Sequence, residues 1–309
     1  MTHVLLVLLS VLPLLLHHGT LVPKNSAPRT EPRQKHVPLK DESTLLESGR
    51  ATKLRQAISQ SNEIKVLSYN IRWRSGNELK KLIKLFQDDP EVGNASIMGL
   101  QEVDRQKKRS GRTNTVKEIA ESLGLYYAWA APPTAKAEDE EETGVAILSV
   151  YPISDIRRIV LPHEGPGKRR RVAIGATLRI TKMTDLRVYS AHAETRISVH
   201  KKLQQMDAVL QDLAQYPRGI PAIVLGDLNT WEPNAGRKVS KLFIDAGLQT
   251  PFGSQRTFSR RILFVPIELR LDWVWLRNLE VAGYGIDSKI NISDHWPLWV
   301  NLKLPPEKQ

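Results

Sequence analysis

Short apolar runs alternate with amphipathic stretches from Glu63 almost to the end of the chain, and this alternation restricts the fold more than any other feature. Nine runs have the length and composition of strands, at 64–69, 96–101, 126–130, 144–149, 172–180, 186–191, 221–226, 272–276 and 296–302. Apolar residues with helical spacing occur at 79–86, 116–123 and 203–213. Because such stripes mark the buried faces of helices, the pattern predicts an α/β domain in which helices cover sheets.

Two parts of this region share a pattern. The run KVLSYN at 65–70 resembles RVYSAH at 187–192, and each is followed by a helical stripe and a second apolar run. Asn70 lies 32 residues before Glu102, and His192 lies 35 residues before Asp227. Two strand–helix–strand units of similar length predict a duplicated half-domain with one sheet packed on another, although matches this short also arise by chance.

Polar side chains stand where the apolar runs end. They are Asn70, Glu102, His192, Asp227, Asn229, Asp272, Asp294 and His295. Taken singly, the amides fit turns or helix caps and the histidines fit hydrogen-bonded structural positions. Taken together, so many carboxylates, carboxamides and imidazoles are costly to bury unless they pair or bind a metal. Since strand ends at one edge of an α/β sheet form sites, the set predicts a single functional site.

The chemistry of this set favours a hard cation. Carboxylate and amide oxygens suit Mg²⁺ or Mn²⁺ better than zinc, and imidazoles paired with carboxylates suit proton transfer near neutral pH. The chain holds 45 Lys and Arg against 33 Asp and Glu, a net charge of +12, which favours anionic partners. It has no cysteine, which excludes disulfides, cysteine nucleophiles and zinc–thiolate sites. These features together indicate hydrolysis of a phosphate ester.

A family resemblance rests on seven motifs over residues 63–303. In chain order they are SYNIRW, LQEVD, TGVAILS, AHAE, GDLNT, LDWVW and SDHWPLWV. Their combination resembles the endonuclease/exonuclease/phosphatase family, the deoxyribonuclease I-like superfamily. The resemblance implies an α/β (α+β) fold, a four-layered sandwich of two mixed β-sheets flanked by helices.

The resemblance also implies which residues bind the cation and the phosphate. Glu102 would hold a divalent cation, Mg²⁺ or Mn²⁺, with help from Asn70 and Asp294. Arg171, at the end of the basic run KRRR, is the best candidate in that run for contacting a substrate phosphate, although a solvated basic loop explains the run equally well. The run RQKKR at 105–109 is open to the same two explanations.

Catalytic roles follow from the same motifs. Asp227 and Asn229 would contact the scissile phosphate or orient the attacking water. His295, oriented by Asp272, would be a general base or a phosphate clamp. His192 would bind the phosphate or assist the leaving group.

The expected activity is metal-dependent hydrolysis of phosphodiester bonds by in-line attack of an activated water. His192 resembles the deoxyribonuclease I, inositol-phosphatase and sphingomyelinase branches, because apurinic-site repair enzymes typically place a tyrosine there. Arg72 also departs from the repair pattern, which has an acidic residue two positions after the Asn. Nucleic acid is the favoured substrate, since no long insertion with exposed aromatic residues for membrane docking is evident. The alternatives are a sphingomyelinase-type or phosphoinositide/inositol-phosphate phosphatase, and a non-catalytic anion-binding module.

The segments outside the domain have a different composition. Residues 1–19 are expected to be a signal peptide or an N-terminal anchor, because the apolar run from Val4 to Leu16 would rise only ~20 Å as a helix. No Lys or Arg precedes that run and no clear A-x-A site follows it. Residues 20–62 read as a flexible basic linker, 63–304 as the domain and 305–309 as a tail. The protein is therefore expected to be exported, either secreted, periplasmic or anchored by its N-terminal segment. A monomer is also expected.

Overall fold

The first sheet of the domain has seven strands. The computed structural model describes residues 42–56, 63–133 and 142–303, so the expected leader, residues 20–41 and 57–62 of the expected linker, and the expected tail lie outside the described part. Across this sheet the strands follow the order β1 (Leu46–Arg50), β4 (Tyr126–Ala130), β5 (Glu142–Ser149), β3 (Ile97–Arg105), β2 (Glu63–Asn70), β14 (Leu298–Lys303) and β13 (Glu280–Ile286). Only β2 and β3 pair in parallel, so the sheet is mixed.

The second sheet has five strands and repeats this construction. Its order is β12 (Asp272–Arg277), β9 (Ala222–Asp227), β8 (Asp185–His192), β7 (Arg171–Arg179) and β6 (Ile153–Leu161). Strands β8 and β9 are its parallel pair, joined through a helix as β2 and β3 are. In register, Asn70 faces Gln101 in the first sheet and His192 faces Asp227 in the second. The two units expected from the internal similarity therefore have the same topology.

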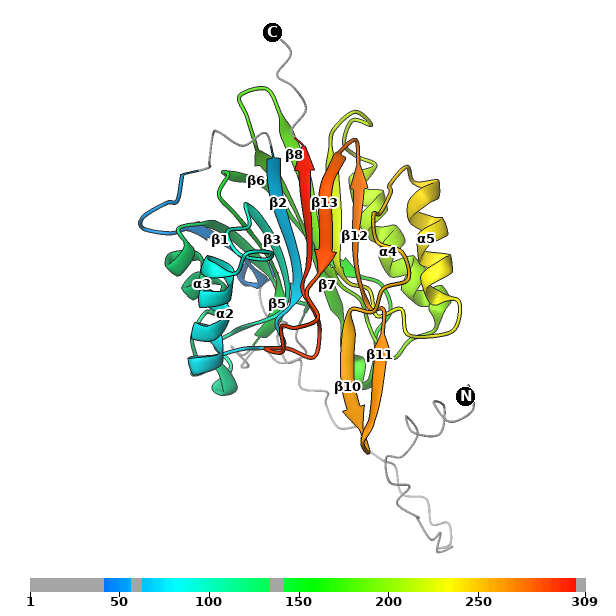
Figure 1. Cartoon of the computed structure of the whole chain (residues 1–309). Helices are drawn as coiled ribbons and strands as arrows, with labels where there is room; N and C mark the ends of the chain where they lie inside the picture. Colours follow the sequence, from blue (N-terminus) through cyan, green and yellow to red (C-terminus); the bar gives the residue numbers. More distant parts are fainter. Residues whose placement is uncertain (1–41, 57–62, 134–141, 304–309) are drawn as a thin grey trace, which may run out of the picture. The chain divides into compact units, whose positions relative to one another are not determined.

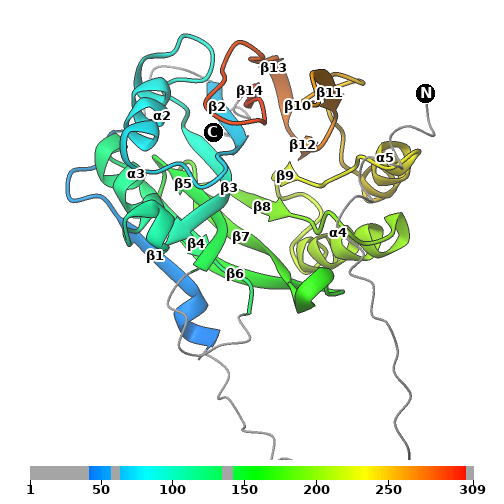
Figure 2. The same cartoon turned by 90° about the horizontal axis from the view of Figure 1, so that it is seen from below.

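The two sheets pack face to face, with helices on both outer sides (Figures 1 and 2). Helices α2 (Gly76–Asp88) and α3 (Thr115–Leu123) bury their apolar stripes against the first sheet, and α4 (Val199–Leu213) and α5 (Ala235–Asp245) bury theirs against the second. A third apolar cluster fills the space between the sheets. The expected four-layered sandwich of two mixed sheets is confirmed.

Strand β1 corrects the expected domain boundary. Residues 20–62 read as a linker, yet Leu46–Arg50 pairs with β4 as the edge strand of the first sheet. The carboxylate of Glu47 accepts hydrogen bonds from Arg105, Asn114 and Tyr127. The segment has too few apolar residues to stand out, because an edge strand is partly solvated and is stabilised here by its polar partners.

A projecting hairpin corrects a second expectation. Strands β10 (Phe258–Ile262) and β11 (Val265–Leu269) form a separate two-stranded sheet that extends beyond the strands of both main sheets (Figure 1). Its tip carries an exposed aromatic residue, Phe264. The preference for nucleic acid over lipid was based on seeing no long insertion with exposed aromatic residues, and this short hairpin with one such residue weakens that reason. Among the described residues, no helix is both long and apolar enough to cross a membrane.

Candidate active site

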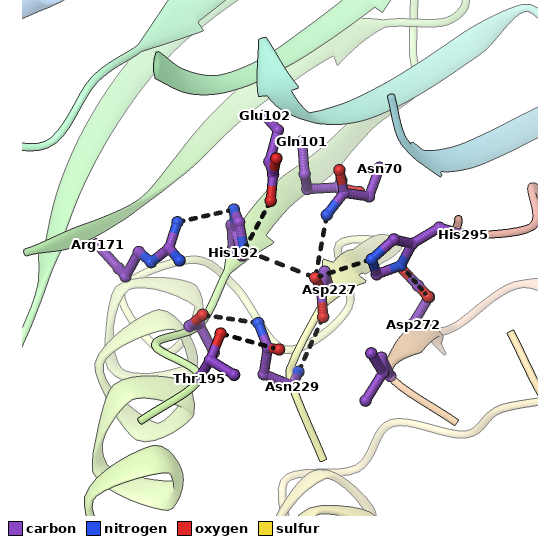
Figure 3. A network of polar contacts seen from close by, with 12 residues as sticks. Asn70, Gln101, Glu102, Arg171, His192, Thr195, Asp227, Asn229, Asp272 and His295 are labelled. Carbon is purple, nitrogen blue, oxygen red and sulfur yellow. Dashed lines mark hydrogen bonds and ion pairs between the residues drawn. The ribbon is translucent and has the colours of Figure 1, made fainter. Parts of the chain in front are cut away.

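The polar strand ends meet around one carboxylate oxygen, Asp227 Oδ2 (Figure 3). Asn70 Nδ2 donates a hydrogen bond to this oxygen at 3.1 Å across the space between the sheets. His192 Nε2 and His295 Nε2 lie 3.6 and 3.8 Å from it, on opposite sides. All four side chains are buried. Asn70 and Asp227, which are 157 positions apart in the chain, thus converge because both sheets end their parallel strands at the same place.

His295 is held by a buried carboxylate. Its Nδ1 lies 2.8 Å from Asp272 Oδ2, which also accepts a hydrogen bond from Thr257 Oγ1 at 2.7 Å. Burial by itself would lower the pKa of His295, but the Asp272 and Asp227 carboxylates outweigh it and raise that pKa to about 10. His295 is therefore an imidazolium, whose Nδ1–H donates to Asp272 and whose Nε2–H faces Asp227.

His192, unlike His295, is a neutral imidazole. Burial, and after it the nearby Arg171 guanidinium, lower the pKa of His192 well below its ordinary value, so the ring is neutral. Arg171 Nη1 lies 3.2 Å from His192 Nδ1. Because arginine can only donate, Nδ1 must accept, and the ring proton must sit on Nε2. That Nε2–H points towards Asp227 Oδ2 and lies 4.0 Å from Glu102 Oε1.

Asp227 is fixed by the loop that follows β9. Its Oδ1 accepts a hydrogen bond from the backbone N–H of Asn229 at 3.0 Å. Asn229 has a positive φ of 51°, a conformation that asparagine tolerates, and its side chain is held by Ala193 and Thr195. Burial raises the pKa of Asp227 to about 7, with Asp272 as the next contributor in the same direction. Asp227 can therefore exchange a proton near neutral pH.

Glu102 reaches the site through an irregularity in β3. The register of β3 against β5 shifts between Gln101 and Val103, and Glu102 has a positive φ of 55°. Such a bulge re-aims a side chain that would otherwise follow the alternation of the strand. The Glu102 carboxylate accepts a hydrogen bond from Trp73 Nε1, and its other oxygen faces His192.

The donors around Glu102 fit a hard divalent cation. Its carboxylate and the Asn70 amide oxygen, which already accepts from the Arg72 backbone N–H but keeps a second lone pair, are the ligand types that Mg²⁺ prefers. One atom each of Asp227, Asp272 and His295 also lie within 4.8 Å of one another. An imidazolium has no lone pair for a metal, so that second group is better explained as a protonated His295 that is hydrogen-bonded to Asp272 and lies between two carboxylates.

Asp294 stands apart from the proposed cation ligands. Its carboxylate forms an ion pair with Arg72 Nη1 at 2.8 Å, and it is absent from the buried acidic group around Asp227. Ser293 connects it to the site, because Ser293 Oγ donates to the backbone oxygen of Asn70. Its role as a cation ligand stays a prediction that these contacts do not favour.

The basic runs are mostly engaged in internal ion pairs. Arg171 and Arg169 both bind the buried carboxylate of Glu194, and Arg171 also reaches His192. In the other run, Arg105 pairs with Glu47 and Glu142, and Arg109 pairs with Asp104. Arg171 is therefore the member of these runs that adjoins the site, and its contact with substrate stays a prediction.

Thr257 and Glu194 were missed by the sequence-based reasoning. Thr257 orders Asp272, and Glu194 orders Arg171, yet neither follows an apolar run in a way that separates it from ordinary loop residues. Glu194 is the last residue of the motif AHAE, in which the resemblance implies a role for His192 alone. That motif is the one signal that would have found it.

The sequence model of the Endonuclease/Exonuclease/phosphatase family matches residues 67–295. The chain belongs to this family. Members of the endonuclease/exonuclease/phosphatase family are generally phosphoester hydrolases.

The chain is also similar to two proteins in part of its sequence and to a solved structure in its fold. UPF0294 protein VV2535 of Vibrio vulnificus (strain YJ016) is 34% identical over 110 residues, which cover 36% of this chain and 36% of the relative. The uncharacterized protein YbhP of Escherichia coli (strain K12) is 26% identical over 171 residues, covering 53% and 64%. The chain thus spans about a third and just under two thirds of these relatives. The human Nocturnin catalytic domain with bound sulfate anion has the same fold, with a TM-score of 0.59, 18% identity and coverage of 83% and 96%.

Proposed function

We propose that the protein is a divalent-metal-dependent phosphodiester hydrolase that works by in-line attack of a water molecule. The observation that carries the proposal is the convergence of Asn70, His192 and His295 on Asp227 Oδ2, with Glu102 beside them. Family membership supports hydrolysis of phosphoesters in general. Sulfate bound to the Nocturnin domain also supports recognition of a tetrahedral anion on this fold.

Glu102 and Asn70 would hold the cation. When bound there, Mg²⁺ or Mn²⁺ supplies Lewis-acid stabilisation of the charge that develops on the phosphoryl oxygens. The remaining work falls to side chains of the chain itself. His192 Nε2 and His295 Nε2 lie 3.6 and 3.8 Å from Asp227 Oδ2, longer than a hydrogen bond, so both Nε2–H groups are available to donate to phosphoryl oxygens.

Asp227 is the group best suited to take the proton of the attacking water. Its pKa of about 7 matches that task at neutral pH, and Asn229 fixes its second oxygen. His295 is already protonated, which favours a clamp on the phosphate over a general base. His192 is neutral and donates through Nε2, which favours binding of the phosphate or of the leaving oxygen.

Loss of single groups tests this assignment. Activity on bis(p-nitrophenyl) phosphate should disappear with EDTA and return with Mg²⁺ or Mn²⁺. His295→Ala should lower kcat by about 10²-fold or more while the fold survives, whereas His200→Ala, at an exposed position on α4, should not. Glu102→Gln should raise the Mg²⁺ concentration that gives half-maximal activity. Wild-type turnover by His295→Ala, or activity that EDTA leaves intact, would refute the proposal.

A substrate panel separates the rival functions. Plasmid DNA, RNA, sphingomyelin and phosphoinositides each report one substrate class, with EDTA as the control in every case. A non-catalytic anion-binding module would bind several of these and turn over none. The retention of Glu102, His192, Asp227 and His295 in one contact network supports catalysis over that alternative.

We also propose that the protein is exported. The support is the apolar run from Val4 to Leu16, which lies outside the described residues. Fractionation of cells that express the full chain, with N-terminal sequencing of the product, tests this. Recovery of the intact chain from the cytosol alone would contradict it.

A further inference from the structure

Exposed apolar side chains gather at the tip of the β10–β11 hairpin. In the described residues, six large hydrophobic side chains are exposed, and three of them are consecutive: Leu263 at 76%, Phe264 at 97% and Val265 at 60%. The other three, Met183, Ile244 and Tyr284, are scattered over the surface. Single exposed apolar residues are ordinary, but a contiguous group at the end of a projecting element indicates a binding surface.

The geometry of the turn at this tip does not favour the residues that occupy it. Ile262 pairs with Val265, so Leu263 and Phe264 form a two-residue loop, and their φ angles are 45° and 70°. Two-residue loops with positive φ at both positions strongly prefer Asn-Gly, because bulky side chains are strained there. Leucine and phenylalanine are thus unfavourable for the turn and unfavourable in water. A partner that buries them would explain both choices.

Arginines stand directly behind the apolar tip. Arg260 and Arg261 on β10 are both exposed, and they pair with Ile267 and Pro266 across the hairpin. An apolar tip followed by cationic side chains matches the depth profile of an anionic lipid surface. The apolar tip enters the acyl boundary, and the guanidinium groups stay level with the headgroups.

The base of the same hairpin contacts the candidate active site. Phe258 forms an isolated bridge with His295 and packs its ring edge-on against the imidazole at a centroid distance of 5.0 Å. Ser259 donates its backbone N–H to the backbone oxygen of Asp294. From Phe258 to the turn, the five residues of β10 span about 16–17 Å. The hairpin is therefore an arm of fixed length between the site and whatever its tip contacts.

We propose that the tip of the β10–β11 hairpin inserts into the interface of an anionic phospholipid bilayer and holds the active site against the membrane surface. Docking rests on the hairpin alone. The corollary, that the enzyme cleaves a phosphoester of a membrane lipid, rests on the proposed hydrolase function. A nucleic acid would leave the apolar tip in water, and so matches the hairpin less well.

A fluorescent probe at the tip tests insertion directly. The chain has no cysteine, so Phe264→Cys gives a single site for an environment-sensitive nitrobenzoxadiazole label on the full-length protein. With phosphatidylglycerol vesicles and EDTA present, the label should brighten, shift to the blue and be quenched by doxyl groups on the lipid chains. The matched control is Met183→Cys, which is 87% exposed between β7 and β8, at the ends of those strands opposite Arg171 and His192. The control label should stay in water, even where the N-terminal segment contributes to binding.

Binding measurements separate the two parts of the tip. Leu263→Asn with Phe264→Gly installs the preferred turn and should weaken partition into phosphatidylglycerol vesicles by about tenfold or more. Arg260→Gln with Arg261→Gln should weaken it by about tenfold, and phosphatidylcholine vesicles should bind wild type comparably poorly. Arg237→Gln with Lys238→Gln, at exposed positions on α5, controls for net charge and should have a smaller effect.

Each outcome supports or overturns the proposal. Equal responses of the two labels, or unchanged partition of the Asn-Gly variant, would overturn docking by the hairpin. A spectral shift at position 264 that depends on protein concentration without vesicles would assign the tip to a second copy of the chain and also overturn it. Since no turnover is measured, these results are independent of the hydrolase proposal. Docking without cleavage of any lipid phosphoester would remove only the corollary.

Discussion

His192 and His295 lie on opposite sides of Asp227 and differ in charge, since His192 is neutral and His295 is protonated. Asp272 and Asp227 stabilise the imidazolium of His295, whereas burial and Arg171 keep His192 neutral. The two residues have the same side chain, and each lies next to an apolar run. Their chemical difference therefore comes entirely from neighbours that are distant in the chain.

Asp272→Asn should reveal what holds the charge on His295. Removal of the Asp272 charge takes away the largest favourable contribution to the imidazolium, so the pKa of His295 should fall from about 10 towards its ordinary value of 6.5. Proton NMR titration of the imidazole in EDTA measures this, with His295→Ala to assign the signal. Asp294→Asn, which removes a weaker contributor, should lower the pKa less. An unchanged pKa in Asp272→Asn would contradict the assignment.

Glu194 should make the folded state sensitive to acid. Burial alone would raise the pKa of its carboxyl group, but the hydrogen bonds and charges of Arg169 and Arg171 lower it below the ordinary 4.5. A depressed folded-state pKa stabilises the protein above about pH 4.5, and the contribution is lost as the pH falls through the folded value. Urea unfolding at pH 6 and pH 3.5 should show a smaller loss of stability in Glu194→Gln than in wild type. An identical loss in both proteins would show that Glu194 does not contribute.

At the scale of elements, the site is assembled from strand ends and irregularities. Strands β2, β8 and β9 end at Asn70, His192 and Asp227, and the bulge in β3 turns Glu102 towards them. The hairpin base supplies Thr257 and Phe258. No single element holds the whole site, so its geometry depends on the packing of both sheets.

The edge strand β1 should contribute measurably to stability. Glu47→Ala removes the acceptor shared by Arg105, Asn114 and Tyr127, and should lower the free energy of unfolding by about 1–2 kcal/mol. Urea denaturation followed by circular dichroism measures the change. Glu118→Ala, at an exposed position on α3, should change it by less than about 0.5 kcal/mol. Equal stability of Glu47→Ala and wild type would mean that β1 behaves as the linker that its sequence suggested.

At the scale of the whole domain, the two sheets approach closely at a point where a glycine of one sheet faces a leucine of the other. Gly99 on β3 lies against Leu225 on β9, and a Cβ added to Gly99 would overlap the Leu225 side chain. Both strands also carry site residues, Glu102 and Asp227. The spacing of the sheets and the geometry of the site are therefore set by the same contact.

A double-mutant cycle tests this contact. Gly99→Ala should destabilise the protein by about 1–3 kcal/mol through overpacking, and Leu225→Ala by about 2–5 kcal/mol through a cavity. Since each change offsets the other, the double variant should be more stable than the sum of the two losses implies. Urea denaturation of the four proteins gives the coupling. Strict additivity would show that the two residues do not set the sheet spacing.

The sequence determined the elements that are buried and regular. All nine expected strands and the three expected helices are present, since full burial imposes long apolar runs and clean helical stripes. Strands β1, β6, β10, β11 and β13 and helix α5 were not expected. Strand β6 shows why, because ISDIRRIVL mixes charges into a half-solvated strand. The polar strand ends and the family motifs also pointed to most of the residues that the fold brings together around Asp227, while their roles stay predictions.

Only the tertiary structure decided how those residues act on one another. Three properties depend on partners from other parts of the fold: the charge on His295, the tautomer of His192 and the ion pair of Asp294 with Arg72. The order of residues in the chain does not say how far apart such partners lie in space. The exposure of Leu263 and Phe264 is of the same kind. An apolar pair in a sequence is most simply assigned to a core, and only the fold shows that this pair stands on a projecting turn where no other part of the domain covers it.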